Sequence, residues 1–235
     1  MSSMPLQLRK MTDILRSDNF EKTIPYLYLD SEGILTVGVG HNLKANRTPN
    51  VFSLSFVVKR LERHATRDGH AGVPITDNPV IGRAATPKEI QNDIDFLQRH
   101  SGLKHYAPQN LAKYTTLELT RFKINALFGR DREIAQAICV KEFGLGAFNA
   151  FPLPCQAALI DIAFNCGSFW SFRGHFLPAI KGNGPYAGKS WKERWTAAAR
   201  YSRRGAVGLT RNAIVRNWLL EGARHGEKTS AKAAA

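Results

Sequence analysis

The stretch that decides the fold is residues 26–40, which reads YLYLDSEGILTVGVG. Aromatic and β-branched residues stand on either side of DSEG at 30–33, a turn that ends in glycine. This pattern predicts a β-hairpin, and it is the only strong β signal in the chain. A short helix is expected just before the hairpin, capped by Thr12 or Asp13 and ending near Glu21.

The rest of the chain carries mainly helical patterns. Thr86, Pro87 and Glu89 form a capping box with proline in the first turn, which predicts a helix to about His100. Apolar spacing predicts further helices over 53–64, 121–140, 155–165, 191–201 and 210–222. The helix over 155–165 is apolar almost all round, so it is expected at the centre of the helical part. Residues 68–85, rich in glycine and proline, are expected to form a loop.

Length and composition favour one globular domain. A chain of 235 residues can bury one substantial core, and its 43% hydrophobic and 22% charged residues are ordinary values. No apolar run approaches the roughly 20 residues that cross a bilayer. Residues 1–10 lack the apolar stretch and cleavage site of a secretory signal. We therefore expect a protein made in the cytoplasm without a signal peptide and without a transmembrane segment.

The charge is strongly positive and unevenly spread. The formal net charge is +14, and residues 170–235 hold 13 Lys and Arg against 3 Asp and Glu. Such a field attracts polyanions, which include nucleic acid, anionic lipid and bacterial cell wall. A solubilising surface is the simpler interpretation, and charge alone names no partner.

The three cysteines, Cys139, Cys155 and Cys166, show no metal-ligand spacing. Cys155 and Cys166 stand about 16 Å apart if they share one helix, which excludes a disulfide between them. We expect all three to be small buried hydrophobic residues. The histidines form no metal-ligand pattern either, so no metal and no other cofactor is expected.

Two acidic residues flank the first strand of the predicted hairpin. Glu21 is expected at the end of the first helix, and Asp30 lies at the hairpin tip. Thr36, on the returning strand, can point to the same face as Asp30. Glycoside hydrolysis needs two such groups on opposite sides of the scissile bond. Gly38 and Gly40 would leave room for a sugar beside the backbone.

Their environments predict different roles for the two acids. At a helix C-terminus Glu21 would meet the negative end of the helix dipole, which disfavours its ionised form. Phe20, and Tyr26 or Tyr28, would add an apolar surround that raises the pKa of Glu21 further. Asp30, in a polar turn, is expected to stay ionised. Carboxylates with separated pKa values divide the work into acid and base.

The motif resembles one known family. Glu21, Asp30 and Thr36, followed by VGVGH at 37–41, are similar to the catalytic segment of the phage-type lysozymes, glycoside hydrolase family 24. Further similar segments follow in the same order: LFGRD at 127–131, QAALIDIAFNCG at 156–167 and GLTR at 208–211. The resemblance covers about residues 12–43 and 120–222.

Two features depart from that family. Lys22 stands where the family usually has glycine after the catalytic glutamate, and we expect its side chain to point away into solvent. Residues 44–119 match no part of the family that we can place. We expect this stretch to cap or extend the cleft and to adjust which glycan fits.

The resemblance implies an α+β, lysozyme-like fold. A small N-terminal β-sheet lobe and a larger all-helical C-terminal lobe would enclose a cleft. One catalytic domain would cover residues 1–226, with lobes over 12–85 and 86–226. Residues 227–235, polar and alanine-rich, are expected to be a disordered tail.

The resemblance also implies a reaction. The β-1,4 bond between N-acetylmuramic acid and N-acetylglucosamine would be hydrolysed with inversion. Glu21 would be the general acid, while Asp30 and Thr36 would position and activate water. Inversion requires about 6.5–9.5 Å between the two carboxyl groups.

Further roles are implied by residues that match the family's motif. Gly40, Phe164, Asn165 and Arg211 match positions near its sugar cleft. Asn165 could instead cap the end of its helix, and Arg211 could contact phosphate or peptide or be a plain surface charge.

One more matching pair is structural in the family. His41 and Asp131 match an ion pair that ties the two lobes together. A catalytic base is the alternative role for His41.

Three functions stay open at this stage. The first is the inverting muramidase, acting as a monomer on bacterial peptidoglycan with no nucleic acid required. The second is a lytic transglycosylase, which works with one acid, so Asp30 and Thr36 argue against it. The third is a non-catalytic basic module that binds cell wall or nucleic acid.

The route to the substrate is also open. Without a signal peptide, a phage pore or secretion machinery would have to release the protein to the periplasm or cell wall. The long middle segment favours an injected effector, which would imply a cognate immunity protein.

Overall fold

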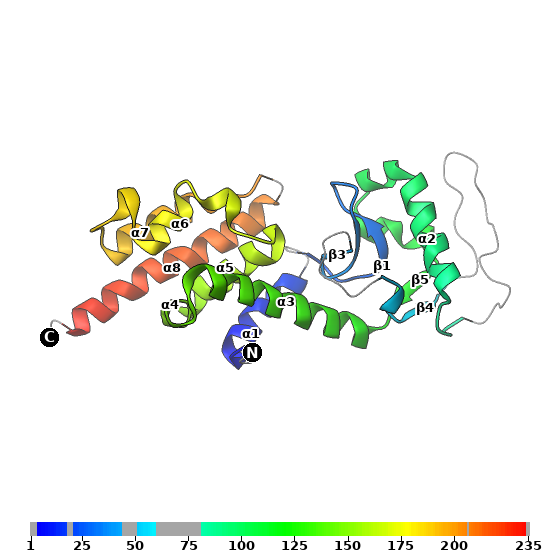
Figure 1. The fold of residues 1–235 in the computed structure, drawn as a ribbon, viewed down its shortest axis with the longest axis horizontal. Coiled ribbons are helices and arrows are strands. Elements are labelled where there is room, and N and C mark those ends of the chain that lie inside the picture. Colours follow the sequence, from blue (N-terminus) through cyan, green and yellow to red (C-terminus); the bar gives the residue numbers. More distant parts are fainter. Residues whose placement is uncertain (1–3, 18–20, 44–50, 60–80, 206, 234–235) are drawn as a thin grey trace. The chain divides into compact units, whose positions relative to one another are not determined.

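The computed structural model describes residues 4–17, 21–43, 51–59, 81–205 and 207–233, with side chains to 224. The chain is α+β, with a small antiparallel sheet and several helices, and it divides into two compact units (Figure 1). Residues 21–129 form the sheet unit, and residues 1–20 with 130–235 form the helical unit. Each unit is described by itself below.

The predicted hairpin is confirmed in the sheet unit. Strands β1 (Ile24–Leu29), β2 (Leu35–Gly38) and β3 (His41–Asn42) form an antiparallel sheet in the order β1-β2-β3. Tyr28 pairs with Thr36, and the register shifts between Ile24 and Tyr28. The Gly33 N–H donates to the Asp30 carbonyl at 2.9 Å and closes the turn.

A second sheet of two strands was not predicted. Strand β4 (Phe56–Val58) pairs with β5 (Leu117–Leu119), following a 3₁₀ turn η2 (Val51–Ser53). The helix predicted over 53–64 is therefore wrong in its described part, and residues 60–64 lie outside the described residues. Residues 56–58 are aromatic and β-branched, with the two outer side chains buried and the middle one half-buried, which suits a strand.

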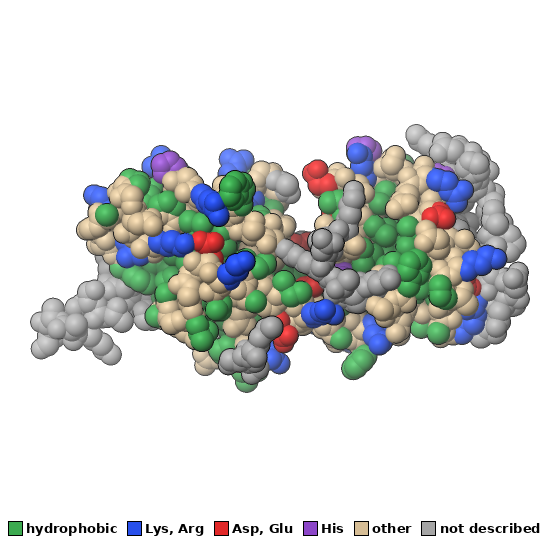
Figure 2. Space-filling view, in the orientation of Figure 1, with side chains coloured by type: hydrophobic (Ala, Val, Ile, Leu, Met, Phe, Trp, Pro, Cys, Tyr) green, Lys and Arg blue, Asp and Glu red, His purple; other side chains and the backbone are tan. Residues whose placement is uncertain are grey.

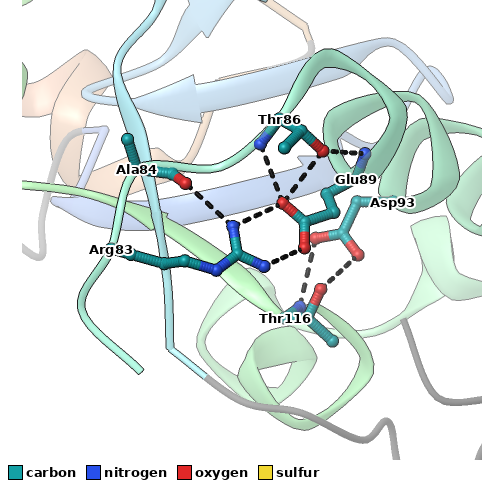
Figure 3. Close-up of polar contacts among 6 residues, drawn as sticks. All are labelled: Arg83, Ala84, Thr86, Glu89, Asp93 and Thr116. Carbon is teal, nitrogen blue, oxygen red and sulfur yellow. Dashed lines mark hydrogen bonds and ion pairs between the residues drawn. The ribbon is translucent and has the colours of Figure 1, made fainter. Parts of the chain in front are cut away.

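Helix α2 (Pro87–Arg99) begins as predicted. The Thr86 hydroxyl accepts a hydrogen bond from the Glu89 N–H, and the Glu89 carboxylate accepts one from the Thr86 N–H at 2.8 Å, so the capping box is complete. The same carboxylate receives the guanidinium of Arg83 (Figure 3). Glu89 therefore joins the start of α2 to the segment that leads into it.

A second buried acid ties α2 to strand β5. Asp93 is fully buried and accepts hydrogen bonds from the Thr116 N–H at 3.1 Å and the Thr116 hydroxyl at 2.9 Å (Figure 3). The 3₁₀ segments η3 (Ser101–His105) and η4 (Pro108–Tyr114) contact β1. These contacts place residues 86–129 in the sheet unit, whereas the predicted helical lobe began at residue 86.

The helical unit is built around α5 (Leu153–Cys166). Every residue from Cys155 to Phe164 is buried, and Gly167, with a φ of 69°, ends the helix. The predicted central helix is thus confirmed, and it contacts α1 and α8. The other elements of this unit are α1 (Leu6–Thr12), η1 (Asp13–Arg16), the C-terminal part of α3 (Arg121–Phe143), α4 (Leu145–Ala150), η5 (Trp170–Phe172), α6 (Phe176–Lys181), η6 (Gly184–Tyr186), α7 (Trp191–Arg200) and α8 (Leu209–Ala233).

Both ends of the chain differ from expectation. The first helix was expected to reach Glu21, but α1 ends at Thr12, η1 ends at Arg16, and Ser17 is extended. Helix α8 continues to Ala233, where a disordered tail was expected from residue 227. Glu, Lys and Ala, which favour helix, predominate in that tail and explain its helical backbone.

No helix in the described parts of the chain has the length and apolar character needed to cross a membrane.

Candidate active site

The Glu21 carboxylate lies against the backbone of Gly40. Gly40 has a φ of +66°, and a Cβ there would stand 2.7 Å from Glu21 Oε2 and 2.9 Å from its Cδ. Gly40 therefore makes room for the carboxylate itself, whereas the sequence suggested room for a sugar. Contact between Gly40 and a sugar stays a prediction.

Glu21 is not at a helix C-terminus. It lies in a turn just before β1, after a helical segment that ends at Arg16. The helix-dipole argument for its role as acid is therefore wrong. Phe20, which was expected to surround it, lies outside the described residues.

Lys22, the next residue, adopts the backbone conformation of a glycine. Its φ is 60°, the one positive value among the described non-glycine residues. Its ammonium donates to Gln109 Oε1 at 3.4 Å in an exposed setting, so the end of the side chain contacts η4. A lysine in this left-handed conformation carries a conformational cost that glycine would not.

Asp30 has one oxygen fixed and one open. Its Oδ1 accepts the N–H groups of Glu32 at 2.9 Å and Ile34 at 2.8 Å. Such a turn, in which aspartate binds its own following backbone, fixes the carboxylate direction. Oδ2 accepts no hydrogen bond from the described residues. It is therefore the oxygen that can bind water or substrate.

The hydroxyl oxygen of Thr36, on β2 of the same sheet, can accept a hydrogen bond. It is buried, and its hydroxyl donates to the Ile34 carbonyl at 3.0 Å. A hydroxyl has one proton, so Oγ1 can only accept from a further partner. Thr36 lies opposite Tyr28 on one side and Asn42 on the other. Residues directly opposite in an antiparallel sheet share a face, so these three side chains form one row.

Tyr28 lies on β1, between Glu21 and Asp30 in the sequence, and pairs with Thr36. The pKa of its phenol is raised above the ordinary 10.0, first by burial and then by the negative charges of Glu21 and Asp30. On the hairpin, Tyr28 lies directly opposite Thr36. The sequence predicted Tyr28 only as apolar surround, although the hairpin register could have indicated its position.

Asn42 was missed altogether. It is half-buried on β3, opposite Thr36. A strand of two residues has no periodicity from which its face could have been predicted.

The other predicted sugar contacts belong to the helical unit. Phe164 is buried and Asn165 exposed near the end of α5. Gly167 caps α5 by donating its backbone N–H to Ala163, and Asn165 accepts from the Cys166 thiol at 3.6 Å. The capping alternative for Asn165 is therefore wrong.

Arg211 is held by a fully buried aspartate. Its Nε donates to Asp161 Oδ1 at 2.9 Å, and Arg204 Nη1 lies 2.6 Å from Asp161 Oδ2. Both arginines are buried. The interpretation of Arg211 as a plain surface charge is wrong, since it shares one carboxylate with a second guanidinium in the core of the helical unit.

His41 and Asp131 are both buried, in β3 of the sheet unit and in α3 of the helical unit. Their ion pair stays a prediction. Of the cysteines, Cys139 and Cys155 are buried as expected, and burial raises the pKa of both thiols. Cys166 is exposed, which corrects that expectation.

A pocket of about 330 Å³ lies elsewhere in the sheet unit. It is lined by residues from the hairpin, α2 and the chain between them: Leu29, Gly33, Leu35, Leu43, Val51, Ile94 and Gln98. Neighbouring residues along a strand point to opposite faces, so Leu29 and Leu35 face away from Tyr28 and Thr36. This apolar pocket is therefore separate from the acids.

Among the described residues, no group of three or more His, Cys, Asp or Glu side chains could hold a metal ion. No protein-family model matches the chain, and no curated protein matches it.

Proposed function

We propose that this chain is a peptidoglycan hydrolase, an inverting N-acetylmuramidase of the lysozyme type. The observation that carries the proposal is the hairpin itself: Asp30 lies at its tip, Thr36 lies on its returning strand, and the Glu21 carboxylate lies against Gly40 just after that strand. A chance surface acid would not be expected to require glycine beside its carboxylate.

In the proposed reaction, Glu21 is the general acid. It donates its proton to the glycosidic oxygen as the bond from that oxygen to the anomeric carbon breaks. Asp30 Oδ2 accepts a proton of the attacking water, and Thr36 Oγ1 accepts its second hydrogen bond. Water attacks the face opposite the leaving group, which inverts the anomeric centre.

The hydrogen bonds of the sheet support this division. Two backbone N–H groups occupy Asp30 Oδ1, and Oδ2 is left for water. The Thr36 hydroxyl donates its one proton to the Ile34 carbonyl, so Oγ1 can still accept a hydrogen bond from water. Both water-binding oxygens are thus oriented before substrate arrives, which lowers the ordering cost of the reaction.

A lysozyme-like cleft belongs to the same proposal. In it the sheet unit and the helical unit are the two lobes, Phe164 and Asn165 contact the glycan, and His41 pairs with Asp131. Arg211 is left out of the proposed contacts because it is buried against Asp161. Peptidoglycan is the proposed partner. Release to the cell wall through a pore or secretion machinery, with an immunity protein in the second case, remains part of the proposal.

The test compares Glu21→Gln with Asp30→Asn and with the parent on dye-labelled sacculi. Each substitution should reduce dye release by at least about 100-fold, because each removes a proton-transfer group. Both variants should still sediment with sacculi. Unchanged dye release from Glu21→Gln would contradict the proposal. Loss in Glu21→Gln with full activity in Asp30→Asn would favour the transglycosylase.

A further inference from the structure

One stretch of the helical unit carries mainly positive side chains. Residues 162–220 contain ten Lys and Arg and one acid, Glu193. Glu193 accepts hydrogen bonds from the Ser190 N–H at 2.9 Å and the Ser190 hydroxyl at 2.8 Å, and it lies 3.6 Å from Lys189. Four of these cations face an acid: Lys189 pairs with Glu193, Lys181 with Glu142, and the buried Arg204 and Arg211 with Asp161. The other cations, Arg173 and Arg200 among them, still outnumber the acids of this stretch and give it a positive field.

An exposed tryptophan lies within this field. Trp170 is 69% exposed, and the guanidinium carbon of Arg173 lies 4.2 Å from the centre of its ring. A cation over an indole face is held there by the ring's quadrupole. The pair presents a flat apolar ring and a positive charge to the same partner.

A second aromatic group is centred on His175, five residues after Trp170. The rings of His175 and Tyr201 stack at 4.5 Å with 18° between their planes. The Tyr186 hydroxyl lies 3.4 Å from His175 Nδ1, and the guanidinium carbon of Arg200 lies 5.7 Å from the centre of the Tyr201 ring. We call Trp170, Arg173, His175, Tyr186, Arg200 and Tyr201 the aromatic–basic patch.

Buried rings hold the patch in position. Phe169, Phe172 and Phe176 are buried under residues 170–175, with Phe172 and Phe176 5.2 Å apart between ring centres. This packing orders the segment that carries Trp170, Arg173 and His175. An ordered surface loses less entropy when it binds, which favours a binding role.

We propose that the aromatic–basic patch binds peptidoglycan, through its sugar rings and the carboxylates of its peptide stems, outside the catalytic residues. The choice of glycan rests on the proposed function. Sugar rings present apolar C–H faces that pack on aromatic rings, and the carboxylates of the wall's peptide stems pair with arginine. Figure 2 shows several Lys and Arg side chains over the helical unit and few acidic ones among them.

Such a patch would lengthen the time that the protein stays bound to an insoluble polymer. Two binding regions on one chain make the second contact intramolecular, so overall affinity exceeds that of either region alone. Short soluble fragments of glycan would not gain from it.

The test uses the full chain carrying Glu21→Gln, so that sacculi stay intact. Trp170→Ala/Arg173→Gln removes the exposed ring and its cation. Phe122→Ala/Lys123→Gln is the matched control, because it removes a ring that is 75% exposed and an adjacent exposed cation from the sheet unit. Binding to sacculi stripped of teichoic acid is measured by sedimentation, with single-stranded DNA as a second probe.

We expect the patch variant to raise the Kd for sacculi by at least about tenfold, on the scale of one lost stacking contact. The control should stay within about twofold of its parent. Unchanged sacculus binding by the patch variant, or a loss confined to DNA, would overturn the proposal. If the parent chain with Glu21 intact releases no fragments while the patch variant still loses sacculus binding, the hydrolase function fails and the patch stands.

Discussion

Substituting alanine for Gly40 should displace the carboxylate of Glu21, the proposed general acid, while leaving the fold intact. The new Cβ would stand 2.7 Å from Glu21 Oε2 and 3.2 Å from its Cγ, whereas ordinary contact begins at 3.4 Å. The carboxylate must therefore retreat from Gly40. Displacement of a catalytic group by about an ångström can cost about 100-fold in rate.

Gly38→Ala is the matched control. Gly38 also has a positive φ, +69° against +66° at Gly40, so each alanine should lose about 1–2 kcal/mol of stability from the left-handed conformation. The Cβ at Gly38 would meet Leu127 at 3.7 Å and Ile124 at 3.9 Å, which is ordinary contact. The two variants therefore share a backbone cost and differ in their effect on Glu21.

Thermal melting and dye release from sacculi separate the two effects. Both variants should melt at similarly lowered temperatures, and Gly40→Ala alone should lose about 100-fold in rate. Equal rates in the two variants would refute the argument that Gly40 places the Glu21 carboxylate.

Three other substitutions test separate parts of the structure. Lys22→Gly should gain about 1 kcal/mol in urea denaturation, because glycine relieves the left-handed strain at a φ of 60°; a loss of stability would contradict this. Tyr28→Phe removes the buried phenol from β1. Because the fold raises the phenol's pKa, the unfolded chain loses this proton first and stability falls as pH rises above 10.0. Melting curves should show a smaller alkaline fall in Tyr28→Phe, and an identical fall would count against the buried phenol. Asp161→Asn should cost about 3–5 kcal/mol in urea denaturation, since it leaves Arg204 and Arg211 without their shared carboxylate; a cost under about 1 kcal/mol would show that the pair is not needed.

Local patterns were sufficient for the elements with strong boundaries. The turn at 30–33 predicted the hairpin because it begins with an aspartate and ends with a glycine. In the structure the Asp30 carboxylate accepts hydrogen bonds from the backbone N–H groups of Glu32 and Ile34. Thr86 and Glu89 predicted the start of α2 through reciprocal hydrogen bonds. Helix α5 was recognised because a helix buried on all sides needs apolar residues on all sides.

Other elements depend on contacts that local patterns do not contain. Residues 56–58 match a helical spacing, but pairing with β5, about sixty residues later, makes them a strand. The assignment of α2 to the sheet unit depends on Asp93 binding Thr116, again a contact between distant residues.

The candidate site was predictable in its residues and less so in their surroundings. Asp30 and Thr36 follow from the hairpin, and Tyr28 follows from its register with Thr36. The contact between Gly40 and Glu21 could not be foreseen, because it depends on how the chain before β1 returns to the end of β2. The dipole argument failed because the helix ends at Arg16, five residues before the acid.

Mass analysis of the fragments released from sacculi is the most direct measurement of the bond that is cut. We predict disaccharide–peptides that end in N-acetylmuramic acid with a reducing end, which borohydride converts to the alcohol, and none from Glu21→Gln. Fragments ending in 1,6-anhydro-N-acetylmuramic acid, or no fragments from the parent protein, would contradict this prediction.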